Sequence, residues 1–195
     1  MLPPQDAAGD IKSMNEATFR REIYQMLRYR YGLWPQHIPD VVGSKRPGVP
    51  DLIIMNPKGP GYYMEVKHLD ASKETSFSFD SIEQSQRRWL TEWESVRSMG
   101  SYLAIGVSGI EKRELYIVWW EQWLAIERVM SEWQNSLPYK VGSGFRKELQ
   151  ELKYDFGKFI PVNKCKMYSP KNRIAGESGW RLPKSLLWDM ELEDE

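Results

Sequence analysis

Residues 46–67 have the sequence R-P-G-V-P-D-L-I-I-M-N-P-K-G-P-G-Y-Y-M-E-V-K, in which two apolar runs, 52–55 and 62–66, flank the loop-forming residues 56–61. Apolar and β-branched runs on either side of a Gly/Pro cluster are typical of two antiparallel strands joined by a longer loop. The sequence therefore predicts a β-hairpin at this point of the chain.

Three charged residues lie within or beside the apolar runs of this hairpin: Asp51, Glu65 and Lys67. Because side chains alternate between the two faces of a strand, Glu65 and Lys67 share one face. Asp51 joins them if paired residue numbers sum to an even value near 116 or 118, and Leu52 and Ile54 then face the core. A slip of one residue would move Asp51 to the opposite face, so the prediction of the register is sharp.

Length and composition indicate one domain with an extension. The chain has 195 residues, of which 41% are hydrophobic and 28% charged, as in ordinary globular proteins. No apolar run approaches the ~20 residues that cross a bilayer, and the N-terminus has no secretory pattern. The single cysteine, Cys165, predicts a reducing cytoplasm, and with His37 and His68 it is too little for a zinc cage. We therefore expect a cytoplasmic protein with no membrane partner.

Charge is balanced over the whole chain but not along it. Lys and Arg total 27, as do Asp and Glu, so the net charge is zero. Residues 11–50 carry seven bases against three acids, residues 138–184 carry eleven against four, and residues 185–195 carry five acids and no base. Two basic segments suit contact with phosphates, although ordinary solvated faces explain them equally well.

A first helix is predicted over residues 14–31, with Ser13 and Glu16 forming a capping box. Glu22 falls on or beside the apolar stripe of this helix. A buried carboxylate is costly without a partner. Glu22 is therefore either in an ion pair, with Arg28, or a metal ligand.

A second helix is predicted over residues 81–99, capped by Asp80 or Ser81 and ended by Gly100. Gln86 lies on its inward face, where a neutral amide needs a hydrogen-bond partner. We expect Gln86 either to bond to a fixed group of a site or to be a satisfied core glutamine.

The remaining elements are predicted from shorter patterns. The expected strands are 36–42, 102–107 and 114–119, and the further expected helices are 121–132 and 145–156. The tryptophans at 119, 120, 123 and 133 can stack on bases, but tryptophan at strand or helix spacing is more often part of a core.

The hairpin charges suit phosphodiester hydrolysis. This reaction needs an activated water and a cation near the phosphoryl oxygens, and Mg²⁺ or Mn²⁺ bound by hard oxygen ligands supplies both. Asp51 and Glu65 are two such ligands, the backbone carbonyl of Val66 can be a third, and Lys67 places a cation beside the phosphate. An ion-pair cluster without catalytic function is the alternative explanation.

These residues resemble the PD-(D/E)XK nuclease superfamily, because Pro50-Asp51 is followed by Glu65-Val66-Lys67. The segments G-V-P-D-L-I, E-V-K and S-Q-R-R-W-L are similar to the VRR-NUC nuclease module. The spacing Ile82-x-x-x-Gln86-x-x-x-Leu90 is also similar to Holliday-junction resolvases of the RecU and archaeal kinds. The resemblance covers residues 16–120.

The resemblance implies a role for each matched residue. Asp51 and Glu65 would bind Mg²⁺ or Mn²⁺, Lys67 would be the catalytic lysine, and Gln86 would orient groups in the site. Glu22 would match the first-helix acid that completes the metal site. The weaker match of the segment Ser44, Lys45 and Arg46 implies contacts with DNA phosphates.

For the whole chain, the resemblance implies an α/β, restriction-endonuclease-like core over residues 1–134, with a mixed central sheet flanked by helices. Residues 135–195 would be a C-terminal extension. The implied activity is metal-dependent cleavage of DNA, on four-way junctions or other branched DNA, in the cytoplasm of a bacterium or a phage-infected host. Two symmetric cuts in a junction predict a homodimer. The alternatives are a VRR-NUC-type nuclease for flaps, nicks or duplex, and a non-catalytic DNA-binding module.

Overall fold

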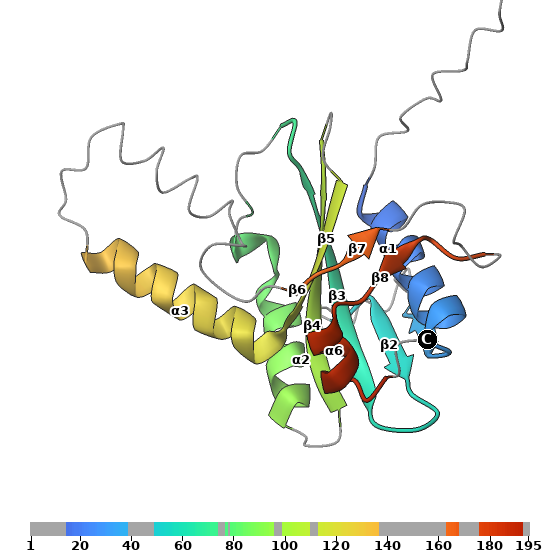
Figure 1. Cartoon of the computed structure of the whole chain (residues 1–195). Coiled ribbons are helices and arrows are strands. Elements are labelled where there is room, and N and C mark those ends of the chain that lie inside the picture. The colour runs from blue at the N-terminus through green and yellow to red at the C-terminus, as the bar shows by residue number, and fades with distance from the viewer. Residues whose placement is uncertain are drawn as a thin grey trace, which may run out of the picture.

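The computed structural model describes residues 15–38, 49–73, 77, 79–95, 99–109, 113–136, 163–167 and 176–192 (Figure 1). Over these residues the fold is α/β, with a mixed sheet flanked by helices, as the sequence predicts. The strands of the main sheet, in spatial order, are β1 (Trp34–His37), β2 (Leu52–Met55), β3 (Gly61–Asp70), β4 (Met99–Ser108), β5 (Arg113–Trp119) and β6 (Asn163–Lys164). Only the β3–β4 pair among these is parallel.

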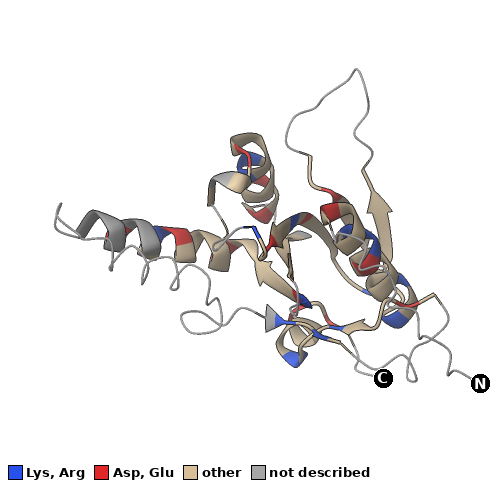
Figure 2. Ribbon diagram, turned by 90° about the horizontal axis from the view of Figure 1, so that it is seen from above, with Lys and Arg blue, Asp and Glu red and all other residues tan. Residues whose placement is uncertain are grey.

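The helices lie on both faces of this sheet (Figure 1). They are α1 (Glu16–Gln25), the π-helical turn η1 (Met26–Arg30), the 3-10 turn η2 (Phe79–Ser81), α2 (Gln84–Ser95), α3 (Trp120–Ser136) and α6 (Lys184–Asp189). Their charged positions are mixed in sign (Figure 2). No helix in the described part of the chain has the length and hydrophobicity needed to cross a bilayer.

The β2–β3 hairpin confirms the predicted register. Leu52 pairs with Met64 and Ile54 with Tyr62, so the paired numbers sum to 116. Leu52, Ile54 and Met64 are fully buried in the core between the sheet and α1. Because β2 and β3 alternate in phase, Asp51 is placed on the face of Glu65, which is the face that α2 covers.

Helix α1 begins at a different cap from the one predicted. The side chain of Asn15 accepts the N–H of Thr18 at 3.0 Å, and the predicted cap Ser13 lies outside the described residues. The helical segment ends before Gly32, whose φ of +62° suits a residue without a side chain. Phe19 packs its ring against the bare Cα of Gly106 on β4, where any Cβ would overlap the ring. This contact holds α1 close to the sheet.

The second helix is shorter than predicted. Helix α2 ends at Ser95, and Gly100 belongs to β4 instead of terminating the helix. Gly100 pairs with Tyr62 of β3, and its Cα faces that ring. Pairing with a distant strand thus prevails over the local helix-ending tendency of glycine, because the parallel ladder satisfies the backbone from Met99 onward.

The other predicted elements are present with shifted ends. Strands expected at 102–107 and 114–119 are β4 and β5, the helix expected at 121–132 is α3, and the strand expected at 36–42 is β1. Trp120 and Trp123 are fully buried, which confirms the core interpretation for these two. The helix predicted over 145–156 and the side chain of Trp133 lie outside what the structure describes.

The described parts of the C-terminal extension pack into the main core. Strand β6 pairs with β5, and a second sheet is formed by β7 (Lys166–Met167) and β8 (Trp180–Arg181). Trp180, Leu186 and Met190 are buried in the same cluster as Phe19 of α1. These residues of the extension therefore share one hydrophobic cluster with the main sheet and α1.

Candidate active site

The start of β2 and the middle of β3 bring the hairpin charges together. Asp51 accepts the backbone N–H of Val66 through Oδ2 at 2.9 Å. Its own carbonyl accepts the N–H of Ile38 at 3.1 Å, which fixes the start of β2 on its other side. The bond from Val66 holds the Asp51 carboxylate next to β3, on the sheet face that Glu65 and Lys67 share.

Glu65 is the most deeply buried member of this group, with 1% of its side chain exposed. Its Oε1 receives the ammonium of Lys67 at 2.7 Å and the amide of Gln86 at 2.5 Å. Among the described residues, its Oε2 is buried and has no hydrogen-bond partner. A buried carboxylate oxygen without a donor is costly, so Glu65 is prepared for a further partner on that side.

Gln86 has the fixed partner that its sequence position requires. Its Nε2 donates to Glu65, and its Oε1 accepts the backbone N–H of Glu83 at 3.0 Å. Because both ends of the amide are used, the orientation of the side chain is determined. Gln86 therefore ties the start of α2 to the carboxylate on β3.

Burial and charge shift the proton affinity of this group. Burial, and after it the neighbouring Asp51, raise the pKa of Glu65, and with Lys67 opposing them the pKa is raised to about 7. Burial lowers the pKa of Lys67, but Glu65, Glu16 and Asp51 together outweigh this effect, so the pKa is raised overall and the ammonium stays charged. The two carboxylates, Asp51 and Glu65, lie on one face of the sheet, and the negative charge of Asp51 disfavours the charged form of Glu65.

Helix α1 contributes two residues that the sequence analysis did not place in the site. The guanidinium of Arg20 forms an ion pair with Asp51 Oδ1. Glu16 lies close enough to raise the pKa values of both Glu65 and Lys67. Their spacing of four residues puts both on one side of the helix, and this spacing is the sequence feature that could place them in the site together. The role of Glu16 in the predicted capping box gives it a sufficient explanation without the site.

Glu22 lies elsewhere. Its Oε1 pairs with Arg113 of β5, and its Oε2 accepts the indole N–H of Trp180 at 3.0 Å. The structure therefore places Glu22 in an ion pair, with Arg113 in place of Arg28, and does not bring it to Asp51 and Glu65. Arg28 instead lies over the ring of Trp34, 5.7 Å from its centroid.

The residues fit a hard divalent cation that keeps part of its water shell. Asp51 and Glu65 supply carboxylates, and Glu65 Oε2 has no other partner among the described residues. The N–H and C=O of one strand residue point to the same side, so the carbonyl of Val66 points toward Asp51 as its N–H does. Among the described residues, no group of three or more His, Cys, Asp or Glu side chains could hold a metal ion.

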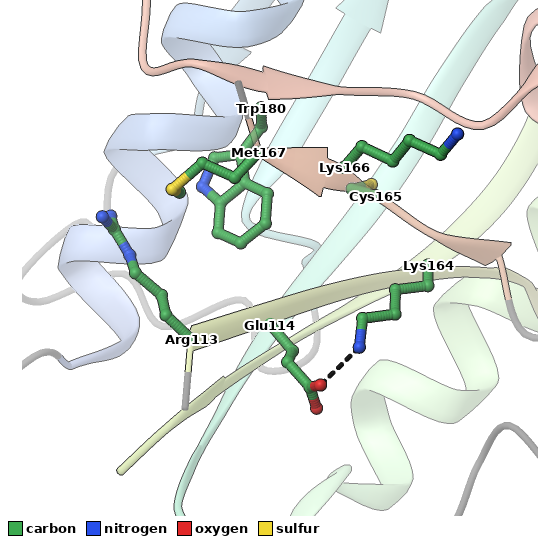
Figure 3. A pocket seen from close by; sticks show the side chains of 7 residues that line it. All are labelled: Arg113, Glu114, Lys164, Cys165, Lys166, Met167 and Trp180. Carbon is green, nitrogen blue, oxygen red and sulfur yellow. Dashed lines mark hydrogen bonds and ion pairs between the residues drawn. The ribbon is translucent and has the colours of Figure 1, made fainter. Parts of the chain in front are cut away.

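Other features lie apart from this group. A pocket of about 560 Å³ is lined by Arg113, Glu114, Lys164, Cys165, Lys166, Met167 and Trp180, and none of these belongs to the hairpin group (Figure 3). Glu114 and Lys164 pair across it, and burial raises the pKa of the Cys165 thiol. The predicted phosphate contacts Ser44, Lys45 and Arg46 lie outside the described residues.

Comparison with protein-family models, with curated proteins and with solved structures finds no match.

Proposed function

We propose that the chain is a metal-dependent DNA endonuclease of the PD-(D/E)XK type. One observation carries the proposal: Lys67 and Gln86 both bind Oε1 of Glu65, while Oε2 stays buried without a partner among the described residues. A group whose only task is an ion pair would not hold a bare carboxylate oxygen beside a second acid, Asp51. A cation at this point satisfies both acids.

Each residue has a separate task in this proposal. Asp51, Glu65 and the carbonyl of Val66 hold Mg²⁺ or Mn²⁺, which supplies charge neutralisation and a more acidic water. Lys67 stabilises negative charge on the phosphoryl oxygens and on the attacking oxygen. Gln86 is a positioning residue, because it fixes the carboxylate of Glu65 without needing to touch the substrate.

Branched DNA is the proposed substrate, on the resemblance to junction resolvases, with a homodimer making the two symmetric cuts. A free, buried Cys165 supports a reducing, cytoplasmic location. Cleavage is to be tested on a four-way junction, a flap and a linear duplex, each with Mg²⁺, with Mn²⁺ and with chelator. We expect junction cleavage that needs metal, and equal cleavage of the linear duplex would remove the resolvase part of the proposal.

Substitutions test the site itself. Asp51→Asn and Lys67→Ala are expected to lose cleavage by about 10²–10³-fold while keeping the wild-type circular dichroism spectrum. Lys73→Ala is the matched control, because Lys73 follows the same strand and is 78% exposed. Calorimetric titration with Mn²⁺ should show binding to the wild type and weaker binding to Asp51→Asn. DNA binding with no cleavage in either metal would instead favour a non-catalytic module.

A further inference from the structure

One part of the sheet face that carries Glu65 is not covered by any helix of the described residues. Helices α2 and α3 pack over β3, β4 and β5, and β1 and β2 continue beyond them. Large apolar side chains are exposed there: Trp34 is 51% and Met55 43% exposed. We call this surface the ledge and define it by six residues, of which Tyr63 is buried beneath the others: Trp34, Ile53, Met55, Tyr63, Trp89 and Trp93.

Strand register places the ledge on the catalytic face. Trp34 pairs with Met55, and Ile53 pairs with Tyr63. Directly paired residues share a face, and positions two apart on one strand do so as well. Met55 and Ile53 are therefore on the same face as Asp51, in a row that leads away from it along β2.

Helix α2 extends the ledge from its other side. Trp89 and Trp93 follow Gln86 by three and seven residues, so they lie along the same stripe of the helix. Their rings stack with centroids 5.6 Å apart and planes 20° from parallel, and Tyr63 lies 5.0 Å from Trp93. Gln86, which bonds Glu65, thus stands at the end of a row of aromatic rings.

The chemistry of the ledge fits unpaired nucleic-acid bases. Partly exposed aromatic rings stack on bases of any sequence, and cations are found at both ends of the row. Lys67 stands at the Glu65 end, and the guanidinium of Arg28 lies 5.7 Å from the ring centroid of Trp34 at the other. A second copy of the chain is a poorer fit, since a stable interface takes roughly 20–30 residues a side and the ledge has six.

We infer that the ledge binds unpaired bases of a DNA strand that enters the catalytic group. The inference rests on the proposed nuclease activity and, among branched DNAs, favours a flap with a single-stranded segment next to the scissile phosphate over a fully paired four-way junction. The bases lie on Trp34, Met55 and the α2 rings, and the backbone of the strand runs toward Lys67. A flap or an overhang is then bound better than a blunt duplex.

Equilibrium binding without metal separates this inference from catalysis. Fluorescence anisotropy in chelator compares three labelled DNAs: a blunt duplex, the same duplex with a short oligothymidine overhang, and that duplex with an overhang of abasic nucleotides. Because stacking on an aromatic side chain strengthens the binding of each unpaired base, we expect the thymidine overhang to bind about ten-fold tighter or more. The abasic overhang should bind like the blunt duplex.

Two variants test the surface directly. Trp34→Ala removes a stacking ring and Met55→Glu places a negative charge on the ledge, and both residues are exposed enough for the fold to persist. Each should reduce the preference for the thymidine overhang to about three-fold or less, whereas Trp34→Phe should retain most of it. Trp188→Ala is the matched control, because Trp188 is 85% exposed on α6, which packs against the other face of the sheet.

Several results would overturn the inference. An abasic overhang that binds as tightly as thymidine would show that only phosphates are read, and an unchanged preference in both ledge variants would show that bases stack elsewhere. A wild-type dimer that Trp34→Ala converts to a monomer would assign the ledge to a second copy. An overhang preference without cleavage in Mg²⁺ or Mn²⁺ would support base binding by the ledge and contradict the proposed nuclease activity. Cleavage without an overhang preference would support the nuclease activity and contradict base binding by the ledge.

Discussion

Glu65 and Glu22 are two largely buried carboxylates on opposite sides of one sheet, with 1% and 14% of their side chains exposed. Both oxygens of Glu22 have partners, Arg113 and Trp180. Glu65 has two partners on one oxygen, and none among the described residues on the other. A carboxylate with partners on both oxygens joins segments of the fold, whereas a carboxylate with one unpartnered oxygen can still bind a ligand.

The partners of the two acids differ in the same way. Those of Glu22 come from β5 and β8, so the pair ties α1 to the middle and the end of the chain. Those of Glu65 are its neighbour Lys67 and the nearby Gln86, which orient the carboxylate without saturating it. We therefore expect changes at Glu22 to lower stability with little effect on cleavage. Changes at Glu65 should lower cleavage without lowering stability.

The largest difference is expected in cleavage. Glu65→Gln should lower the cleavage rate by about 10²–10³-fold, since in the proposed function it removes a metal ligand and charge stabilisation from the transition state. Glu22→Gln should leave the rate within about three-fold, because its site contains no proposed catalytic group. Rates under single-turnover conditions measure both. Equal loss in the two variants would erase the distinction between a structural and a catalytic acid.

The pH dependence of stability is the next largest effect. The pKa of Glu65 is raised to about 7, so between pH 4.5 and 7 the folded chain binds more protons than the unfolded chain. The stabilisation from protonated Glu65 is complete below about pH 4.5 and is lost as the pH rises through about 7.

Glu65→Gln mimics the protonated acid, so in chelator it should match the wild type at low pH and exceed it by up to about 3 kcal/mol near pH 8. Urea unfolding at a series of pH values gives both curves. Parallel curves for wild type and variant would mean that Glu65 titrates normally.

Local patterns were enough to predict the hairpin, its register and the need of Gln86 for a partner. Alternation on β3 and the Gly/Pro loop are properties of neighbouring residues, and they place Asp51 beside Glu65. The partners of Glu22 are 91 and 158 residues away, so no helical periodicity could identify them. Gly100 shows the same limit, because a strand 38 positions earlier, at Tyr62, determines its conformation.

Truncation of Glu22, the acid whose two oxygens both have partners, should lower stability moderately. Glu22→Ala leaves the indole N–H of the buried Trp180 and the guanidinium of Arg113 without their acceptor, at about 1–3 kcal/mol of the free energy of unfolding. Thermal and urea unfolding measure the loss. Glu22→Gln keeps an oxygen for Trp180 and should recover part of it, and a neutral result for Glu22→Ala would mean that these bonds do not join α1 to the C-terminal strands.

The smallest effect concerns Arg20, whose positive charge stands next to Asp51 in the absence of metal. Arg20→Gln removes the charge that is paired with Asp51, so the metal-free protein should lose about 1 kcal/mol of stability. The same change removes repulsion between the guanidinium and an incoming cation, so Mn²⁺ should bind about five-fold tighter, as 1.4 kcal/mol corresponds to ten-fold. Arg21→Gln, next along the helix and exposed, is the control for calorimetry and unfolding. A variant that loses both stability and Mn²⁺ affinity would show that Arg20 supports the arrangement of the carboxylates instead of competing for Asp51.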